Sequence, residues 1–204
     1  MRLSKKSWAV IKTIVFLLSL LPFLFLVNDA LQNQLGANPI ETLHFRLGDW
    51  AIRFLCIGLV LTPIKKLFKQ SWPTRFRRMM GLFAFFYASL HFLVYSILDL
   101  ELSWRLFIDE VPNSPYILIG LFTYALLIPL ALTSTKGMQK RLGKRWIQIH
   151  RLVYLAAVTA VVHYLWLVKA DYNEPLLYAA IVFILLLLRV RFKGQLYRYQ
   201  RTSN

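Results

Sequence analysis

The chain has little charge and almost no cysteine. Only 17% of its 204 residues are charged, and Cys56 is its single cysteine. One cysteine excludes an intramolecular disulfide and cannot form a thiolate metal cluster by itself, so we expect it to serve packing. Hydrophobic residues make up 58% of the chain, and the mean hydropathy of +0.52 is far from that of a soluble domain. The composition therefore predicts an integral membrane protein.

Six apolar runs are long enough to cross a bilayer as helices. They predict an all-α fold in which residues 1–204 form one domain, a six-helix transmembrane bundle with short connections. The first run follows basic residues, as in a secretory signal, but it is long and no small-x-small cleavage site follows, so we expect it to be retained. The runs span about residues 8–27, 47–64, 79–98, 116–134, 147–168 and 175–190.

Acidic residues are missing from one side of this predicted topology. The segment before the first run and the second, fourth and final connections hold 21 of the 25 lysines and arginines, while all nine acids lie in or beside the other connections. The positive-inside rule then places both termini in the cytoplasm. The segregation indicates membrane topology and contact with anionic lipids rather than nucleic-acid binding, with docking of an acidic cytoplasmic partner as the alternative. The basic residues are Arg2, Lys5, Lys6, Lys12, Lys65, Lys66, Lys69, Arg75, Arg77, Arg78, Lys136, Lys140, Arg141, Lys144, Arg145, Arg151, Arg189, Arg191, Lys193, Arg198 and Arg201.

Two histidines, His91 and His163, lie inside apolar runs. Each stands eight residues before an acid of the outer side, Asp99 or Asp171, which predicts the same depth of about 12 Å in helices that run in the same direction. Two neutral imidazoles in an apolar, aromatic-lined space suit the iron of a b-type haem better than zinc, which takes four protein ligands at structural sites. The alternative is that both rings hydrogen-bond to neighbouring helices as structural contacts.

A third histidine, His150, lies near the cytoplasmic boundary. On an ideal helix it is about 20 Å from His163 and about 140° around the axis, so the two need not serve one cofactor. It could ligate a second haem, donate to a flavin or a haem propionate, or contact lipid headgroups. A second redox group near His150, Arg77 and Arg78 would carry electrons over the remaining bilayer, and the arginines would stabilise propionates or a flavin phosphate.

Two polar residues of the outer side have simpler interpretations. His44 precedes the second run, and a lone loop histidine is more often solvated than a ligand. Arg53 could hold haem propionates, although an ion pair with Asp49 at i, i+4 is at least as consistent with the sequence.

Several motifs together resemble a known family, the haem-binding membrane subunits of the periplasmic methionine sulfoxide reductase system (MsrQ, also called YedZ), within the ferric reductase-like transmembrane superfamily. The similarity covers nearly the whole chain, and the order and spacing of the motifs make it specific. The motifs are HFRLGDW (44–50), TPIKKL (62–67), RRMMGLFAFFYASLHFLVY (77–95), SPYILIG (114–120), LGKRWIQIHRLVYL (142–155) and HYLW (163–166).

The resemblance implies one or two b-type haems, association with FMN and a multi-pass location in a bacterial inner membrane. It implies electrons from a cytoplasmic flavin reductase and delivery to a periplasmic molybdopterin-containing methionine sulfoxide reductase subunit that repairs oxidised proteins. The chain would be an electron-transfer subunit rather than the catalytic one. The family's ligand histidines fall on His91, His150 and His163. Two-haem members of the superfamily carry a further histidine about fourteen residues before the outer one, where this chain has Arg77, so His150 lacks its expected partner.

Two other classes of function remain open from the sequence. A ferric or quinone oxidoreductase of the cytochrome b type would share the haem but pass its electron to a small molecule. A small transporter or assembly factor would have no redox role and would leave the two histidines at matching depth unexplained.

Overall fold

The structure, a computed structural model, describes the backbone of residues 4–202 and the side chains of residues 4–190. The side chains of Arg2, Arg191, Lys193, Arg198 and Arg201, which the sequence places on the basic side, lie outside these residues. The described part is helical and contains no strand. Its elements are α1 (Lys5–Leu31), α2 (Pro39–Leu67), the 3-10 turn η1 (Trp72–Arg75), α3 (Arg77–Val94), the π-helical turn η2 (Tyr95–Asp99), α4 (Trp104–Glu110), α5 (Pro115–Leu132), α6 (Lys136–Leu142), α7 (Lys144–Ile149), α8 (Leu152–Leu167) and α9 (Asn173–Thr202).

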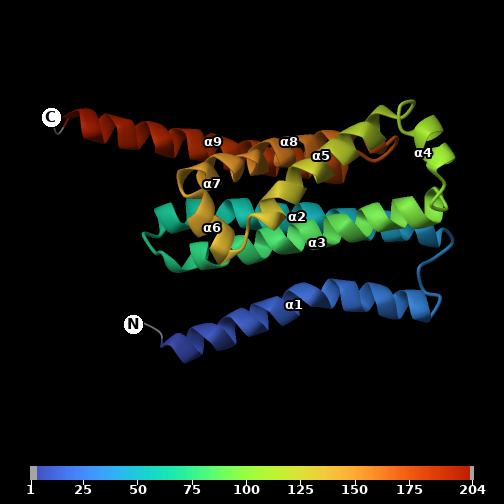
Figure 1. Cartoon of the computed structure of the whole chain (residues 1–204), viewed down its shortest axis with the longest axis horizontal. Coiled ribbons are helices and arrows are strands. Elements are labelled where there is room, and N and C mark those ends of the chain that lie inside the picture. The colour runs from blue at the N-terminus through green and yellow to red at the C-terminus, as the bar shows by residue number, and fades with distance from the viewer. Residues whose placement is uncertain (1–3, 203–204) are drawn as a thin grey trace.

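The predicted six-helix membrane bundle is confirmed. Six helical segments of the described chain are long and apolar enough to cross a bilayer, with α3 continuing into η2 and α7 into α8. The start of α1 and the end of α9 lie at the same end of the bundle (Figure 1). This basic end also holds residues 65–78 and 136–145. The opposite, acidic end holds α4 and the connection before α9.

Two helix pairs form the centre of the bundle. The helices of each pair, α2 with α3 and α5 with α8, pack closely along their lengths, and α9 contacts α8 and α2. Helix α1 lies to one side (Figure 1). Its main polar attachment is the hydroxyl of Tyr87 on α3, which accepts from the Phe23 amide at 3.1 Å and donates to the Ser19 carbonyl at 2.8 Å. These two backbone groups are the donor and acceptor of one helical bond next to Pro22, where the helix is already weakened, so Tyr87 binds both ends of that bond.

Helix α2 starts well before the predicted second run. It begins at Pro39, whose missing amide costs nothing at the first helical position, and the Asn38 side chain accepts from the amide of Glu41. Two helical turns therefore precede the apolar run, and His44 lies in a helix rather than in a loop.

The predicted fifth helix is interrupted. Helix α7 ends at Ile149, His150 and Arg151 form a turn, and α8 begins at Leu152. Before it, Gly143 has φ of +52°, a conformation that favours glycine, and this residue separates α6 from α7. The short helices α4 and α6 were not predicted either.

Candidate functional site

His91 and His163 meet in the half of the bundle nearer the acidic end. Their ring centroids are 6.2 Å apart and the ring planes are nearly perpendicular, at 79°. His91 comes from the last turn of α3 and His163 from α8, two helices that run in the same direction. The structure thus brings together the two histidines that the sequence placed at matching depth.

Each of these rings is oriented by a backbone carbonyl of the neighbouring helix. Nδ1 of His91 lies 3.1 Å from the His44 carbonyl oxygen, and Nδ1 of His163 lies 2.7 Å from that of Tyr116. A carbonyl can only accept, so in each ring Nδ1 carries the proton and Nε2 keeps its lone pair. This is the usual arrangement of a metal-binding histidine, whose second nitrogen is held by a carbonyl or carboxylate.

A glycine lies beside each ring. Gly48 is one turn after His44, and a Cβ on it would lie 3.5 Å from Cε1 and Nδ1 of His91. Gly120 is one turn after Tyr116, and a Cβ there would come within 2.8 Å of Cε1 of His163. The absence of a side chain at position 120 lets the His163 ring approach α5, whereas the space beside His91 would accept a Cβ at position 48 in ordinary contact.

The two half-sites are related by a constant offset of 72 residues. Adding 72 to the residue number gives Tyr116 from His44, Gly120 from Gly48 and His163 from His91. The same offset relates the helix pair α2 and α3 to the pair α5 and α8. Neither the two glycines nor the two carbonyls were predicted from the sequence. The signal that could have found them is this offset, which aligns HFRLG with YILIG.

The residues at this site fit a haem with two axial histidines. The two rings face each other with centroids 6.2 Å apart, and each keeps an unprotonated Nε2, so both could ligate the iron of one haem. Among the described residues no group of three or more His, Cys, Asp or Glu side chains could hold a metal ion. A porphyrin supplies the other four ligands to its iron, so two histidines are enough for haem but too few for structural zinc.

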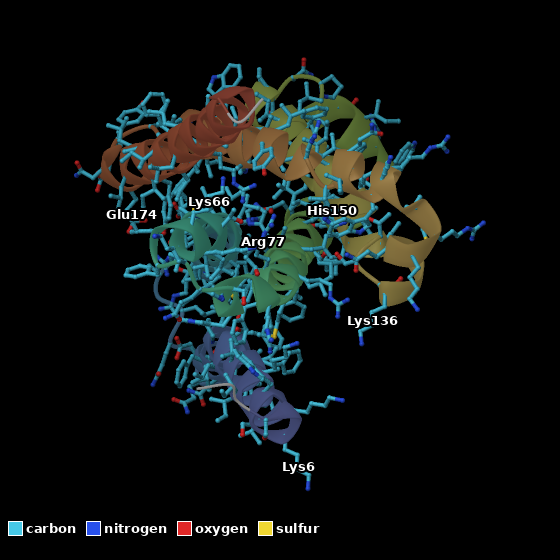
Figure 2. The ribbon with its side chains drawn as sticks, turned by 90° about the vertical axis from the view of Figure 1, so that its left-hand side faces the viewer. Lys6, Lys66, Arg77, Lys136, His150 and Glu174 are labelled. Atoms are coloured by element: carbon cyan, nitrogen blue, oxygen red, sulfur yellow. The ribbon has the colours of Figure 1, made fainter. Side chains whose placement is uncertain are left out.

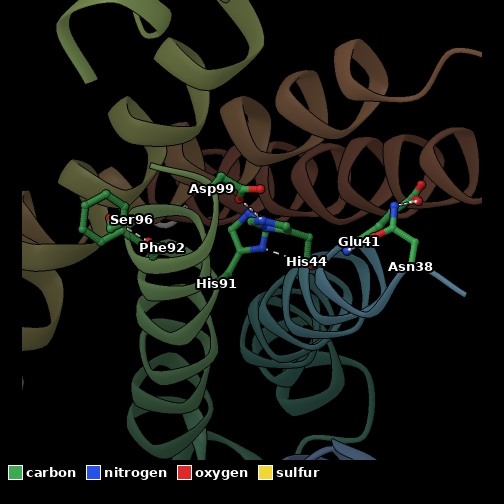
Figure 3. A network of polar contacts seen from close by, with 7 residues as sticks. All are labelled: Asn38, Glu41, His44, His91, Phe92, Ser96 and Asp99. Atoms are coloured by element: carbon green, nitrogen blue, oxygen red, sulfur yellow. Dashed lines mark hydrogen bonds and ion pairs between the residues drawn. The ribbon is translucent and has the colours of Figure 1, made fainter. Parts of the chain in front are cut away.

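His44 is more than a solvated surface residue. Its Nε2 pairs with Oδ2 of Asp99 at the end of η2, and its ring meets that of His91 edge to face with centroids 5.2 Å apart (Figure 3). The expectation of a lone loop histidine was wrong because α2 starts earlier than its apolar run. The signal for that start, Asn38 followed by Pro39, was present in the sequence.

Arg53 has three partners in the structure. Its guanidinium lies 3.3 Å from Oδ2 of Asp49, donates to the Tyr178 hydroxyl at 2.9 Å, and lies 5.0 Å from the centre of the Trp50 ring. Of the two alternatives left open by the sequence, the structure contains the ion pair with Asp49.

His150 lies apart from the other two, at the break between α7 and α8. Its ring stacks on Trp146 with centroids 3.9 Å apart, and its Nε2 lies 3.1 Å from Oγ1 of Thr133. The single hydroxyl proton of Thr133 is donated to the Pro129 carbonyl at 2.6 Å, so Thr133 accepts from His150. His150 is therefore protonated at Nε2, the reverse of the other two rings, and only its Nδ1 is left with a lone pair. The ideal-helix angle of about 140° to His163 does not apply across this break.

His150 and Arg77 line one cavity of about 780 Å³ at the basic end. Viewed from that end, Lys66, Arg77 and His150 point toward the middle of the bundle, whereas Lys6 and Lys136 point outward (Figure 2). Arg78, the other predicted cofactor-binding arginine, is exposed and is not among the residues that line this cavity.

A model of the ferric reductase like transmembrane component family matches residues 13–161. A relative from Herminiimonas arsenicoxydans, named protein-methionine-sulfoxide reductase heme-binding subunit MsrQ, is 46% identical over 94% of this chain and 89% of its own length. Proteins of the same name from Rhodospirillum rubrum and Xanthomonas euvesicatoria pv. vesicatoria are 47% and 43% identical, over 86% and 92% of this chain and 85% and 90% of their own lengths. No solved structure matches the chain. With most of its length covered by both comparisons, this multi-pass membrane protein belongs to the ferric reductase-like transmembrane family and, within it, to the MsrQ heme-binding subunits.

Proposed function

We propose that the protein is the haem-binding, electron-transfer membrane subunit of a methionine sulfoxide reductase system in a bacterial inner membrane. The observation that carries this proposal is the facing pair His91 and His163, each with Nδ1 held by a carbonyl and Nε2 left as a lone pair. These two residues would hold a b-type haem as axial ligands. The haem would supply reversible one-electron transfer.

The direction of transfer follows from the charge distribution. The basic end would face the cytoplasm and take electrons from a flavin reductase, and the acidic end would face the periplasm and its molybdopterin-containing methionine sulfoxide reductase subunit. The haem site lies nearer the acidic end, so a further redox group is needed toward the basic end. FMN or a second haem near His150, with Arg77 stabilising its anionic groups, would fill this role.

The haem assignment is tested by measuring haem per chain with a pyridine haemochrome assay on purified protein. We expect His91→Ala and His163→Ala each to lose most of the bound haem, because a single axial ligand remains. His150→Ala is the matched control: it should keep the haem at the acidic end and slow its reduction from the basic side. A full normal spectrum in His163→Ala would refute the pairing.

The partner is tested by following reoxidation of the reduced protein. We expect the reduced haem absorbance to decay when the molybdenum-containing reductase and methionine sulfoxide are both present, and to persist when either is omitted. Equally fast reoxidation by a ferric chelate or a quinone without the reductase would instead support a small-molecule acceptor.

A further inference from the structure

Tyr95 carries a buried hydroxyl group that has no partner. Its Oη is enclosed by the protein and makes no hydrogen bond, and the other two such side-chain atoms in the described part of the chain, on Thr62 and Arg189, lie at the basic end. A buried tyrosine hydroxyl usually has an acceptor, because a donor that has lost water and gained nothing in return is unfavourable. This hydroxyl therefore indicates an acceptor from outside the chain.

Tyr95 lies one turn outward of His91 on the same helix. Its amide donates to the His91 carbonyl, so the regular α-helix extends as far as this residue before the π-helical turn η2 begins. Residues four apart lie on one face of an α-helix, about 6 Å apart along its axis. The phenol is thus on the side of α3 that presents His91.

The same hydroxyl also lies near the second half-site. Tyr116, whose carbonyl holds Nδ1 of His163, is close enough to interact with it electrostatically. A group that neighbours both His91 and Tyr116 lies beside the space between the two imidazoles. A porphyrin held by these imidazoles is wider than either ring, so its edge reaches the next turn of the helices that hold its iron.

The polar side chains of the protein around Tyr95 are already engaged or turned to solvent. Asp99 pairs with His44, and Glu110 on α4 is exposed. Both carboxylates interact electrostatically with the Tyr95 hydroxyl, but neither accepts a hydrogen bond from it. Ser96, the next residue, donates to a carbonyl of its own helix at 2.9 Å (Figure 3). The missing acceptor is therefore expected in whatever fills the space between the two imidazoles.

We propose that the Tyr95 hydroxyl donates a hydrogen bond to a propionate of the haem that His91 and His163 hold. The inference rests on the haem of the proposed function and adds a contact away from the iron, which fixes the rotation of the porphyrin between its two ligands. A donor at the propionate weakens the negative charge felt at the iron. Reduction adds one negative charge there, so the bond favours the reduced haem and raises its midpoint potential.

The test is a redox titration of purified, haem-loaded Tyr95→Phe, followed at the absorbance of the reduced haem. Loss of the donor should lower the equilibrium constant for haem reduction by about threefold to tenfold, and the larger change corresponds to a fall of about 59 mV for a one-electron couple. The propionate bending band in the resonance Raman spectrum should shift as well, because the carboxylate loses a hydrogen bond. Both ligand histidines remain, so the absorbance spectrum should stay that of the wild type.

Tyr124→Phe is the matched control. It removes the same hydroxyl from a tyrosine whose ring stacks on Phe92, beside His91, but this hydroxyl donates to Oγ of Ser89 at 3.1 Å within the protein. Its midpoint potential and propionate band should equal those of the wild type. A second comparison uses protein reconstituted with haem dimethyl ester, which has no ionised propionate. With this haem the difference in potential between the wild type and Tyr95→Phe should largely disappear.

A wild-type potential and propionate band in Tyr95→Phe would overturn the proposal, as would an equal shift with the ester haem. Where Tyr95→Phe retains too little haem to titrate, Tyr95→His, which keeps a ring with an N–H donor, should restore haem and potential, and loss of haem in both variants would also overturn the proposal. The haem site itself is tested separately by haem per chain in His163→Ala. Haem retained in that variant, together with a shifted potential in Tyr95→Phe, would contradict the proposed ligand pair and support the bond to the propionate.

Discussion

A few single residues determine the orientation of the His91 and His163 imidazoles. Tyr116 and His44 hold the Nδ1 atoms of His163 and His91 through backbone carbonyls, and the His44 ring also contacts that of His91. Glycine at position 120 then determines how near the His163 ring can come to α5. His44 and Tyr116 differ in side chain but offer the same carbonyl, which is why residue type alone did not reveal them.

Adding one methyl group at these glycines should have unequal effects. A Cβ at position 120 would come within 2.8 Å of Cε1 and 2.9 Å of Nδ1 of His163, so the ring would have to move away from the carbonyl that it binds at 2.7 Å. A Cβ at position 48 would make ordinary contacts of 3.5 Å. We therefore expect Gly120→Ala to lose haem or to shift its absorbance and Gly48→Ala to retain it, as measured by haem per chain. Loss of haem in Gly48→Ala alone would contradict this geometry.

His44 offers a second test at this scale. Because its backbone orients His91 while its side chain pairs with Asp99, His44→Ala should keep the haem and lower the thermal midpoint by an amount consistent with about 1 kcal/mol. Thermal unfolding followed at the haem band measures both properties. Haem loss as complete as in His91→Ala would mean that His44 is itself a ligand.

At the scale of secondary structure, the sequence predicts the membrane spans but not their breaks and extensions. The six apolar runs predicted the six spans because length and hydropathy are dictated by the bilayer itself. The break at His150 and Arg151 has no proline or glycine to indicate it. It coincides with tertiary contacts, namely the bond from His150 to Thr133 and that from the Trp146 indole to the Thr133 carbonyl at 3.0 Å. The extra turns of α2 contain polar residues, so they do not belong to an apolar run and were not predicted as part of the span.

The attachment of α1 to the rest of the bundle should depend on one hydroxyl. Tyr87→Phe would leave the Ser19 carbonyl and the Phe23 amide without their shared partner in a buried place, which costs about 1–3 kcal/mol. The expected result is a lower thermal midpoint with the haem spectrum unchanged.

Tyr124→Phe serves as the control for this change. The Tyr124 hydroxyl donates to Oγ of Ser89, which keeps its own bond to the Phe85 carbonyl when Tyr124 is truncated. The loss of stability should be smaller than in Tyr87→Phe. Equal losses in the two variants would show that the inserted hydroxyl has no special role.

At the scale of the whole molecule, the separation of charge predicts the orientation in the membrane. Native Cys56 is buried, so a cysteine introduced at an exposed site can be labelled selectively. In intact spheroplasts we expect a membrane-impermeant maleimide to label Asn113→Cys, at the acidic end, and to spare Gln70→Cys, at the basic end, until the membrane is permeabilised. The reverse pattern would invert the direction of electron transfer proposed above.

The offset of 72 residues has a consequence for assembly. Each half-site supplies one imidazole, so a haem bound between His91 and His163 would form a coordination cross-link between the α2–α3 and α5–α8 pairs. These pairs are otherwise joined by packing and one connecting segment. Loading the cofactor would then complete the tertiary structure as well as the redox centre. Newly inserted chains that have not yet acquired haem should accordingly be the form most accessible to membrane proteases.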